Sequence, residues 1–295
     1  SISRQNLTVI IVSFFSGNVI HDCIRSIPKD IKIIIVDNSN NKSFKSEIEK
    51  KYNNVRCVLS EKNIGMGAGN NYGLSEIDTD YGFILNPDVV LRNDTIDEII
   101  FASKKIGAFS IISPMMEDEN YPNYKMSKGN NSIYKKEEPF KVKSVDGFAM
   151  LLNISRLNKL ENFRNKKYFD ENIFLYLEND DLCKRIIENG ENIYIIPKSK
   201  IKHLGAKAVD EKYKYEIELS RNWHWVWSKF YFNKKHYGFL RACIKVCPIF
   251  ISATIKMLLY FFINKRKKKI YLYRALGFLN AVTGKKSFYR PKINN

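Results

Sequence analysis

The chain has 295 residues, of which 44% are hydrophobic and 27% are charged, which excludes a disordered or fibrous protein and leaves room for a large core. The formal net charge is +18, and residues 221–295 contribute 17 Lys and Arg with no Asp or Glu. The remaining residues carry 32 basic against 31 acidic side chains, so the sequence describes a nearly neutral domain followed by a cationic extension.

Apolar runs alternate with amphipathic stretches over the first 115 residues. The runs are rich in Ile and Val and predict buried strands at 7–14, 31–37, 55–59, 81–85 and 108–113. Helices are predicted near 18–27, 43–52, 68–77 and 94–106. This alternation predicts an α/β domain with a mostly parallel, Rossmann-like sheet flanked by helices, and such sheets bind ligands at the carboxyl ends of their strands.

The middle of the chain is less regular. Residues 117–143 are polar and rich in turn formers, which predicts a surface excursion or hairpin, and a strand is expected at 144–152. A helix is expected from about Asn179, followed by a short strand at 192–197. We place the boundary between a catalytic domain, 1–208, and a C-terminal region, 209–295, where the sequence becomes aromatic and basic.

Four predicted strands end in polar residues that a parallel sheet would gather on one edge. These residues are Ser13, Asp37-Asn38-Ser39, Glu61-Lys62-Asn63 and Asn86-Pro87-Asp88. Asp, Asn and Ser side chains there suit hydrogen bonding to a nucleobase and a ribose. The alternative is ordinary turn chemistry, because the same residue types are common after strands in any fold.

The third strand leads into a glycine-rich segment, NIGMGAGNNYG, at residues 63–73. Glycines that open a helix let backbone N–H groups approach a phosphate closely. The spacing departs from the dinucleotide-binding fingerprint, and a glycine turn that packs a helix on the sheet explains the same pattern.

Four further residues bear groups with catalytic potential. Asp88 is a lone carboxylate at a strand end, where it suits a hard cation that bridges two phosphates, or a proline turn capped by Asp. Glu178 and Asp181 lie at the start of a predicted helix, either as a general base or as acids that favour the helix dipole. Asp181 is expected to face Arg185 one helical turn away. His203 is either a ligand or a structural histidine.

The order of these motifs resembles that of the family 2 glycosyltransferases, and it is most similar to the bacterial rhamnosyltransferase-like branch. The likeness covers residues 7–210 and rests on the following segments: DNS (37–39), NIGMGAGNN (63–71), NPDVV (86–90), VDGFAMLL (145–152), YFDENIFLYLENDDLCKR (168–185) and His203. It implies a GT-A fold and inverting transfer from a nucleotide-sugar, such as a dTDP- or UDP-sugar, with Mg²⁺ or Mn²⁺. The acceptor would be a saccharide or lipid-linked saccharide in surface polysaccharide or O-antigen assembly.

The resemblance also implies roles for single residues. Asp37, with Ser13 and Asn38, would meet the nucleoside, and Asn63, Gly65 and Gly69 would line the nucleotide pocket. Asp88 matches the last carboxylate of the family's Asp-x-Asp metal motif, and Asn86 stands at the first position of that motif. Gly147 and Phe148 match the stretch that lines the sugar, and His203 matches a histidine that approaches the metal or the diphosphate.

The general base is the main departure from the family pattern. Glu178 matches the first member of a Glu-Asp pair, and the second member is Asn179 here. Because an amide is not a useful proton acceptor, we expect Glu178 to serve as the base, with Asp181 as the second candidate.

The cationic extension contains RNWHWVWSKFYF at 221–232, a long apolar run at 237–263, and KRKKK at 265–269. Residues 246–263 are marginal for a membrane-spanning helix, and a pair of interfacial helices with aromatics at headgroup level fits better. Packing within the protein is the alternative, and nucleic acid is disfavoured because of the aliphatic runs. We therefore expect 221–295 to attach the protein to an anionic membrane surface.

The expected location is cytoplasmic, at the inner face of the cell membrane. The N-terminus runs straight into a strand without a signal-peptide cleavage region, and the five cysteines have no CxxC spacing. Two other functions stay open from the residues. One is a sugar-nucleotide nucleotidyltransferase, and the other is a non-catalytic lipid- or nucleic-acid-binding protein with a degenerate transferase domain.

Overall fold

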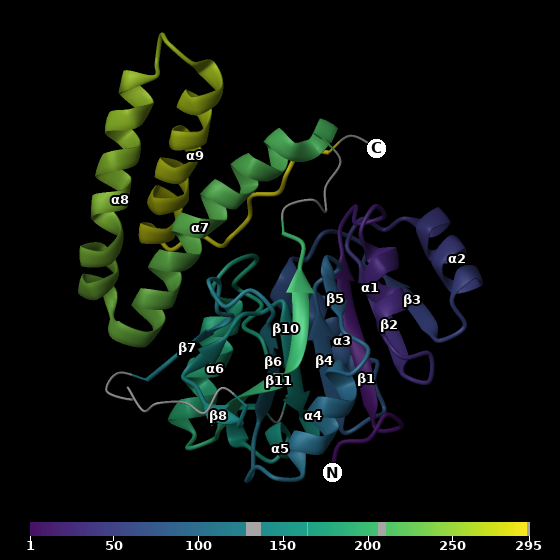
Figure 1. The fold of residues 1–295 in the computed structure, drawn as a ribbon. Helices are drawn as coiled ribbons and strands as arrows, with labels where there is room; N and C mark the ends of the chain where they lie inside the picture. The colour runs from purple at the N-terminus through teal and green to yellow at the C-terminus, as the bar shows by residue number, and fades with distance from the viewer. Residues whose placement is uncertain (128–136, 164, 206–210, 294–295) are drawn as a thin grey trace. The chain divides into compact units, whose positions relative to one another are not determined.

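The computed structural model describes residues 1–127, 137–163, 165–205 and 211–293 (Figure 1). The chain divides into two compact units. The first unit comprises Ser1–Phe169 and Asn179–Ala208, and the second comprises Asp170–Glu178 and Val209–Asn295. The short segment Asp170–Glu178 thus groups with the C-terminal helices, a feature that the division at residue 208 lacks. The functional division into two domains stays a prediction.

The first unit is built on a sheet whose N-terminal half is parallel, in the order β3-β2-β1-β4. The strands are β1 (Leu7–Ser13), β2 (Lys32–Asp37), β3 (Val55–Leu59) and β4 (Tyr81–Leu85). They agree with the predicted ranges to within one residue at each end. Side chains alternate between the faces, so that Val9 and Ile11 enter one core while Ile10 enters the other. Continuous apolar runs are required because helices cover both faces.

The other half of the sheet is mixed. β10 (Ala149–Asn153) runs antiparallel between β4 and β6 (Ile111–Met116), and β11 (Ile193–His203) runs parallel to β6. β11 also pairs with β5 (Val89–Leu91) and β8 (Phe140–Lys141). The strand predicted at 144–152 is in fact two strands, since β9 (Ser144–Val145) pairs separately with β7 (Tyr124–Lys125). The predicted hairpin at 117–143 lies partly outside the described residues.

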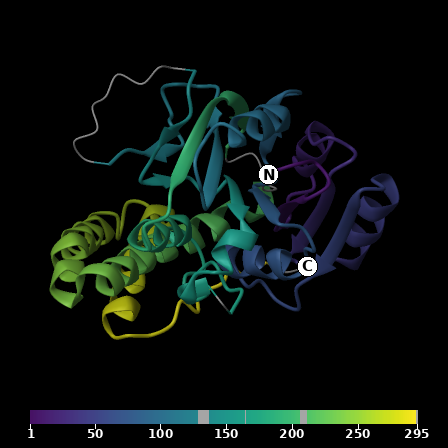
Figure 2. The ribbon, with the colours of Figure 1, turned by 90° about the horizontal axis from the view of Figure 1, so that it is seen from below.

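Helices cover both faces of this sheet (Figure 1, Figure 2). On one face lie α1 (Ile20–Ser26), α2 (Lys42–Lys51) and α4 (Thr95–Ser103). On the other lie α3 (Met66–Ser75), α5 (Ile154–Leu157) and α6 (Glu178–Glu188), with the short 3-10 helix η1 (Glu161–Phe163). The predicted α/β architecture is confirmed, and the first four helices lie where the amphipathic stretches predict them.

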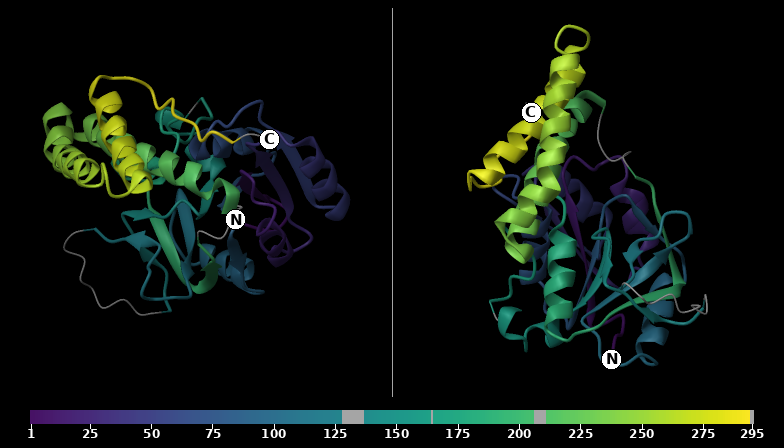
Figure 3. Two further views of the ribbon diagram at one scale, coloured as in Figure 1. Left: turned by 90° about the horizontal axis from the view of Figure 1, so that it is seen from above. Right: turned by 90° about the vertical axis from the view of Figure 1, so that its left-hand side faces the viewer.

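The second unit contains a three-helix bundle, α7 (Lys214–Tyr237), α8 (Phe239–Leu259) and α9 (Lys265–Val282), preceded by η2 (Glu211–Tyr213) (Figure 3). Its core contains Trp223 and Trp227, which are 2% and 3% exposed. The expectation that aromatic side chains lie at headgroup level is therefore wrong for Trp223 and Trp227, because both pack in the core of the bundle. The long apolar run forms a single helix, α8, with Pro248 inside it.

α8 has two unlike faces. Ala242, Val246 and Ala253 are buried in the bundle, whereas the large apolar side chains on the opposite face are exposed, chiefly Leu240, Ile244, Ile251, Ile255, Leu258 and Leu259. Within the described part of the chain, it is the one helix long and apolar enough to cross a membrane by length and composition. Only 17% of its apolar window is buried.

Candidate active site

The predicted polar residues do gather at the carboxyl edge of the parallel strands. Ser13 and Asp37 are register partners at the ends of β1 and β2, and the Asn38 N–H donates to the Ser13 carbonyl over 2.8 Å. Asn86 follows directly on β4, the neighbour of β1 on its other side. Because β10 runs antiparallel to β4, it begins at this same edge, where Gly147 and Phe148 precede it. The topology therefore brings together residues from four distant parts of the sequence.

The Asp37 carboxylate is largely occupied by its own turn. It is 1% exposed, and its oxygens accept hydrogen bonds from the Ser39 N–H at 3.1 Å, the Ser39 hydroxyl at 2.7 Å and the Asn41 N–H at 2.8 Å. These bonds are the turn chemistry that was the alternative for this strand end. The predicted contact of Asp37 with a nucleoside stays a prediction.

The glycine-rich segment is tied to this edge. Gly65, with φ at 88°, lies in the region that favours glycine and starts α3. Its N–H donates to Asn63 Oδ1 over 3.2 Å, and its carbonyl accepts from Asn38 Nδ2 at 3.0 Å. Asn38 Oδ1 is buried without a partner among the described residues, so it can accept a further hydrogen bond from a ligand.

Gly69 has a packing role. A Cβ on it would lie 2.9 Å from Val12 Cγ1, so glycine is needed for α3 to approach β1. This is the packing explanation of the glycine pattern, and it leaves the predicted role of Gly69 in nucleotide binding untested.

Asp88 and His203 form the clearest functional pair in the first unit. Asp88 Oδ2 lies 3.2 Å from His203 Nε2, although the two residues are 115 positions apart. The imidazole stacks on Phe148, with 4.2 Å between ring centroids, and the Leu204 N–H donates to the Asp88 carbonyl at 3.0 Å. The Asn86 N–H donates in turn to the Phe148 carbonyl at 3.0 Å. Backbone and ring contacts thus fix both side chains next to each other at the carboxyl edge of the sheet.

This donor set suits a divalent cation that also binds phosphate. Mg²⁺ and similar ions are typically held by one or two carboxylates together with substrate phosphates and waters. Asp88 and His203 supply two donors, and Asn86 Oδ1 is a buried oxygen without a partner among the described residues. No cluster of three His, Cys, Asp or Glu occurs in the described ranges, so the phosphates would have to complete the shell.

Asp146 is a carboxylate that the sequence reasoning missed. Burial is the main cause of the raised pKa of Asp146, and the charge of Asp180 adds to it. The positive charges of Lys125 and His203 act in the opposite direction. The residue is in the turn between β9 and β10, directly before Gly147. A carboxyl with a raised pKa close to His203 is a candidate proton acceptor. Asp146 lies in this turn because the strand predicted at 144–152 is two strands, β9 and β10.

Asn179 is structurally engaged. Its Nδ2 donates to the Val145 carbonyl over 2.9 Å, and its Cβ is 3.2 Å from the position that a Cβ on Gly147 would take. A carboxylate could not donate that hydrogen bond. Glu178 precedes Asn179 as the first residue of α6.

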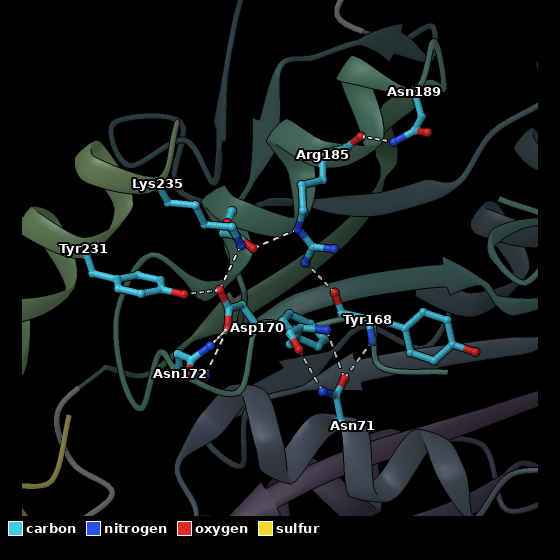
Figure 4. Close-up of polar contacts among 10 residues, drawn as sticks. Asn71, Tyr168, Asp170, Asn172, Arg185, Asn189, Tyr231 and Lys235 are labelled. Atoms are coloured by element: carbon cyan, nitrogen blue, oxygen red, sulfur yellow. Dashed lines mark hydrogen bonds and ion pairs between the residues drawn. The ribbon is translucent and has the colours of Figure 1, made fainter. Parts of the chain in front are cut away.

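Asp181 is completely buried, and its Oδ2 accepts from Arg185 Nε at 2.9 Å, as the helical spacing predicts. Arg185 also donates to the Tyr168 carbonyl, and Asn71 binds the backbone of Tyr168 (Figure 4). A carboxylate held in this way braces the chain and is closed to a substrate hydroxyl. The role of Asp181 as the second candidate base stays a prediction, and its burial favours Glu178 as the first candidate.

The strand order and the position of β10 define a GT-A fold, and comparison with solved structures supports this class. Mannosyltransferase PcManGT from Pyrobaculum calidifontis, in complex with GDP-Man and Mn²⁺, has a TM-score of 0.54 at 11% identity, covering 95% of this chain and 88% of its own. S. aureus TarS 1-349 in complex with UDP has a TM-score of 0.51 at 15% identity, covering 98% and 94%. These likenesses establish the fold.

The family follows from the sequence. Residues 8–160, a little over half of the chain, match the model of glycosyl transferase family 2, and the chain belongs to that family. It is also 24% identical over 205 residues to the low-salt glycan biosynthesis hexosyltransferase Agl10 of Haloferax volcanii. The aligned region spans 64% of the length of that relative. The predicted family and fold are thus confirmed, and the rhamnosyltransferase-like branch stays a prediction.

Proposed function

We propose that this protein is an inverting, metal-assisted glycosyltransferase that moves a hexose from a nucleotide-sugar to a saccharide or lipid-linked saccharide. The observation that carries the proposal is the Asp88–His203 pair at the carboxyl edge of a GT-A sheet. Agl10 is named a glycan biosynthesis hexosyltransferase, and the solved neighbours bind GDP-Man, a nucleotide-sugar, or UDP, the nucleotide that a UDP-sugar donor would release. Rhamnose and a dTDP or UDP carrier are the first donors to test.

In the proposed reaction, an acceptor hydroxyl attacks the anomeric carbon from the face opposite the diphosphate. The new bond joins the acceptor oxygen to that carbon, the bond to the diphosphate oxygen breaks, and the nucleoside diphosphate leaves with the electron pair. Glu178 accepts the hydroxyl proton. A Mg²⁺ or Mn²⁺ ion bound at Asp88 and His203 would offset the charge of the leaving diphosphate. Asn38 and Gly65 would orient the nucleotide.

The proton acceptor is tested by comparing two carboxylates. Glu178→Gln should lower turnover by about 10²–10⁴-fold, the usual contribution of a general base. Asp146→Asn is the matched variant, because it also replaces a carboxylate by its amide. If Asp146→Asn loses activity by that factor while Glu178→Gln keeps it, the roles are reversed.

The donor is best identified by thermal stabilisation. A ligand that binds only the folded state raises the melting temperature, so a panel of nucleotide-sugars with and without Mn²⁺ reports donor and metal together. Stabilisation by one sugar nucleotide, enhanced by Mn²⁺, is expected. A donor that stabilises but is never transferred or hydrolysed would favour the non-catalytic alternative.

We further propose that the helical region attaches the enzyme to the inner face of the cell membrane as a peripheral protein. The exposed apolar face of α8 continues into Phe262, which is 93% exposed, and Ile263. The basic run at 265–269 follows at once. An apolar face next to lysines is typical of a helix that lies in the interface of an anionic membrane.

Two measurements distinguish lying on a membrane from crossing one. Salt-sensitive sedimentation with anionic liposomes supports surface attachment, since screening weakens exposed charge pairs. Leu258→Glu should reduce sedimentation, and Ile187→Glu, at another exposed apolar position outside the bundle, is the control. Retention in the membrane after carbonate extraction would instead indicate that α8 spans it.

A further inference from the structure

The helical unit contains a cavity of about 500 Å³ that the proposed mechanism does not use. It is lined by α7, α9 and the segment that ends at Glu178. The residues that carry its character are Tyr176, Arg221, Asn222, Trp225, Arg266 and Arg274. All of them belong to the second unit, so the cavity is a property of that unit alone.

The cavity has an excess of positive charge. Three arginines and Lys214 line it, against one carboxylate, Glu218. Glu218 Oε2 lies 3.4 Å from Arg266, which leaves Arg221 and Arg274 without that counter-charge. Neither Arg221 nor Arg274 has a carboxylate within ion-pair distance in the portion of the chain that the structure describes. Such a cavity is built for an anion.

Arg274 is held ready by uncharged partners. Its Nε donates to Asn222 Oδ1 at 2.6 Å, and its guanidinium lies 5.5 Å from the centre of the Trp225 ring. Asn222 is itself fixed, because its Nδ2 donates to the Glu218 carbonyl at 2.8 Å. Because the Asn222 amide and the Trp225 ring are uncharged, they position Arg274 without neutralising its charge. The two parallel N–H groups of a guanidinium match the spacing of phosphate oxygens.

Arg266 and Arg274 of α9 line the cavity, and Figure 1 shows that α9 begins directly after the connection from α8. Arg266 is in the first turn of α9, three residues after Ile263. If Phe262 and Ile263 enter the hydrocarbon, Arg266 is at the depth of the phosphate groups.

The same cavity is joined to the proposed base. Tyr176 lines it two residues before Glu178, and both Tyr176 and Leu177 have positive φ, at 70° and 67°. Residues other than glycine seldom adopt this backbone conformation, and those that do are concentrated near functional sites. Burial raises the pKa of Tyr176, Arg221 lowers it and Glu178 raises it, so this hydroxyl is within electrostatic reach of both residues.

We propose that this cavity binds the phosphate or diphosphate ester through which a lipid-borne acceptor is attached to its carrier. The inference rests on the proposed glycosyltransferase function and adds the acceptor class to it. Arg221 and Arg274 bind the phosphate oxygens, and the segment 176–178 joins this anchor to the base.

The first test uses inorganic diphosphate and the fluorescence of Trp225. Trp223 and Trp227 are buried, so Trp225 is the indole best placed to respond to a ligand, and Trp225→Phe should remove the signal. Arg221→Gln should weaken binding about tenfold or more, as expected for loss of a charge-assisted hydrogen bond. Arg241→Gln removes the same charge from α8 outside the cavity and should change binding less than about twofold. Equal weakening by both variants, or no saturable signal, overturns the proposal.

The second test separates a lipid-linked substrate from an ordinary headgroup. Phosphatidylcholine vesicles carry either an isoprenoid diphosphate or phosphatidylglycerol at matched surface charge. Preference for the isoprenoid diphosphate that Arg221→Gln and Arg274→Gln abolish supports an acceptor site. Equal, arginine-dependent binding to the two kinds of vesicle would assign the site to ordinary headgroups and overturn the acceptor assignment. A short RNA that competes more strongly than the isoprenoid diphosphate would also overturn it.

Failure of the proposed function has a separate signature. Arg221→Gln should raise the KM for the lipid-linked acceptor about tenfold or more, whereas hydrolysis of the donor by the wild-type protein, measured without acceptor, reports the transferase function by itself. If the wild-type protein neither hydrolyses nor transfers any donor yet binds diphosphate through Arg221, the transferase proposal fails and the phosphate site stands.

Discussion

Replacement of Asn71 by alanine should destabilise the first unit far more than its single side chain suggests. Asn71 Oδ1 accepts hydrogen bonds from the N–H groups of Tyr168 and Phe169 at 3.1 and 2.9 Å, and its Nδ2 donates to the Phe169 carbonyl at 2.9 Å (Figure 4). Asn71 is 4% exposed and both aromatic residues are buried. The substitution therefore leaves three buried backbone groups without these partners.

The expected cost follows from that count. A buried polar group left unsatisfied costs about 1–3 kcal/mol, and partial relaxation brings the expected total to about 3–6 kcal/mol. In native-state hydrogen exchange, 3 kcal/mol corresponds to roughly two orders of magnitude in the exchange rates of the Tyr168 and Phe169 amides. Urea unfolding of the full chain should show the same loss in the transition of the first unit.

Asn189 supplies the matched control. Its Nδ2 donates to the Arg185 carbonyl at 2.7 Å, but the residue is exposed, so water replaces the lost bond. Asn189→Ala should therefore cost less than about 0.5 kcal/mol. Equal stability of the two variants, or unchanged exchange at residues 168 and 169 in Asn71→Ala, would refute the reasoning that backbone satisfaction sets the cost.

Three further outcomes are expected. Asp88→Asn should abolish the Mn²⁺-dependent part of the thermal stabilisation by a nucleotide-sugar, and unchanged Mn²⁺ dependence would remove Asp88 from the metal site. Gly277→Ala should lower the melting temperature of the helical unit, because the new Cβ would lie 2.3 Å from the Trp223 carbonyl, and Gly17→Ala, where nothing lies within 4 Å, is its control. Burial alone would raise the pKa of Asp170, but hydrogen bonds from Lys235 and Tyr231 outweigh it and lower the pKa to about 2. The Asp170 carboxylate therefore stabilises the fold above pH 4 and loses this effect as the pH falls towards 2. When the free energy of unfolding is followed down to acid pH, Asp170→Asn should lose about 2 kcal/mol less than the unsubstituted protein. Equal losses in the two proteins would contradict the lowered pKa.

The sequence was most informative where both faces of a strand are buried. β1 to β4 are unbroken runs of Ile, Val and Leu, and their ends match the prediction closely. β5 was missed because it has three residues and pairs with the end of β11. β11 was expected to end near residue 197, yet it continues to His203 after a register shift between Ile196 and Lys200. Lysines are tolerated there because the strand is partly exposed on one face.

That extension decides the candidate site. His203 lies beside Asp88 because the last residues of β11 pair with β5, and no local sequence pattern predicts this pairing. The motif order identifies both residues, but their 3.2 Å separation is a result of tertiary pairing. The same holds for the aromatic segment of α7. Its composition is that of an interfacial belt, whereas helical periodicity turns Trp223 and Trp227 into the bundle and leaves Trp225 at the cavity.

The two asparagines that stand in place of family carboxylates have different structural fates. Asn179 uses its amide N–H to bind the Val145 carbonyl, a bond that Asp could not make, so the substitution is explained by packing and moves the proposed proton transfer to Glu178. Asn86 keeps a buried oxygen without a partner in the described residues, beside Asp88. A second carboxylate there would add a buried negative charge next to the first, and the amide supplies a donor oxygen without that cost. Because Asn86 preserves a donor oxygen and Asn179 preserves a contact, the departures from the family pattern are consistent with a working transferase and argue against a degenerate one.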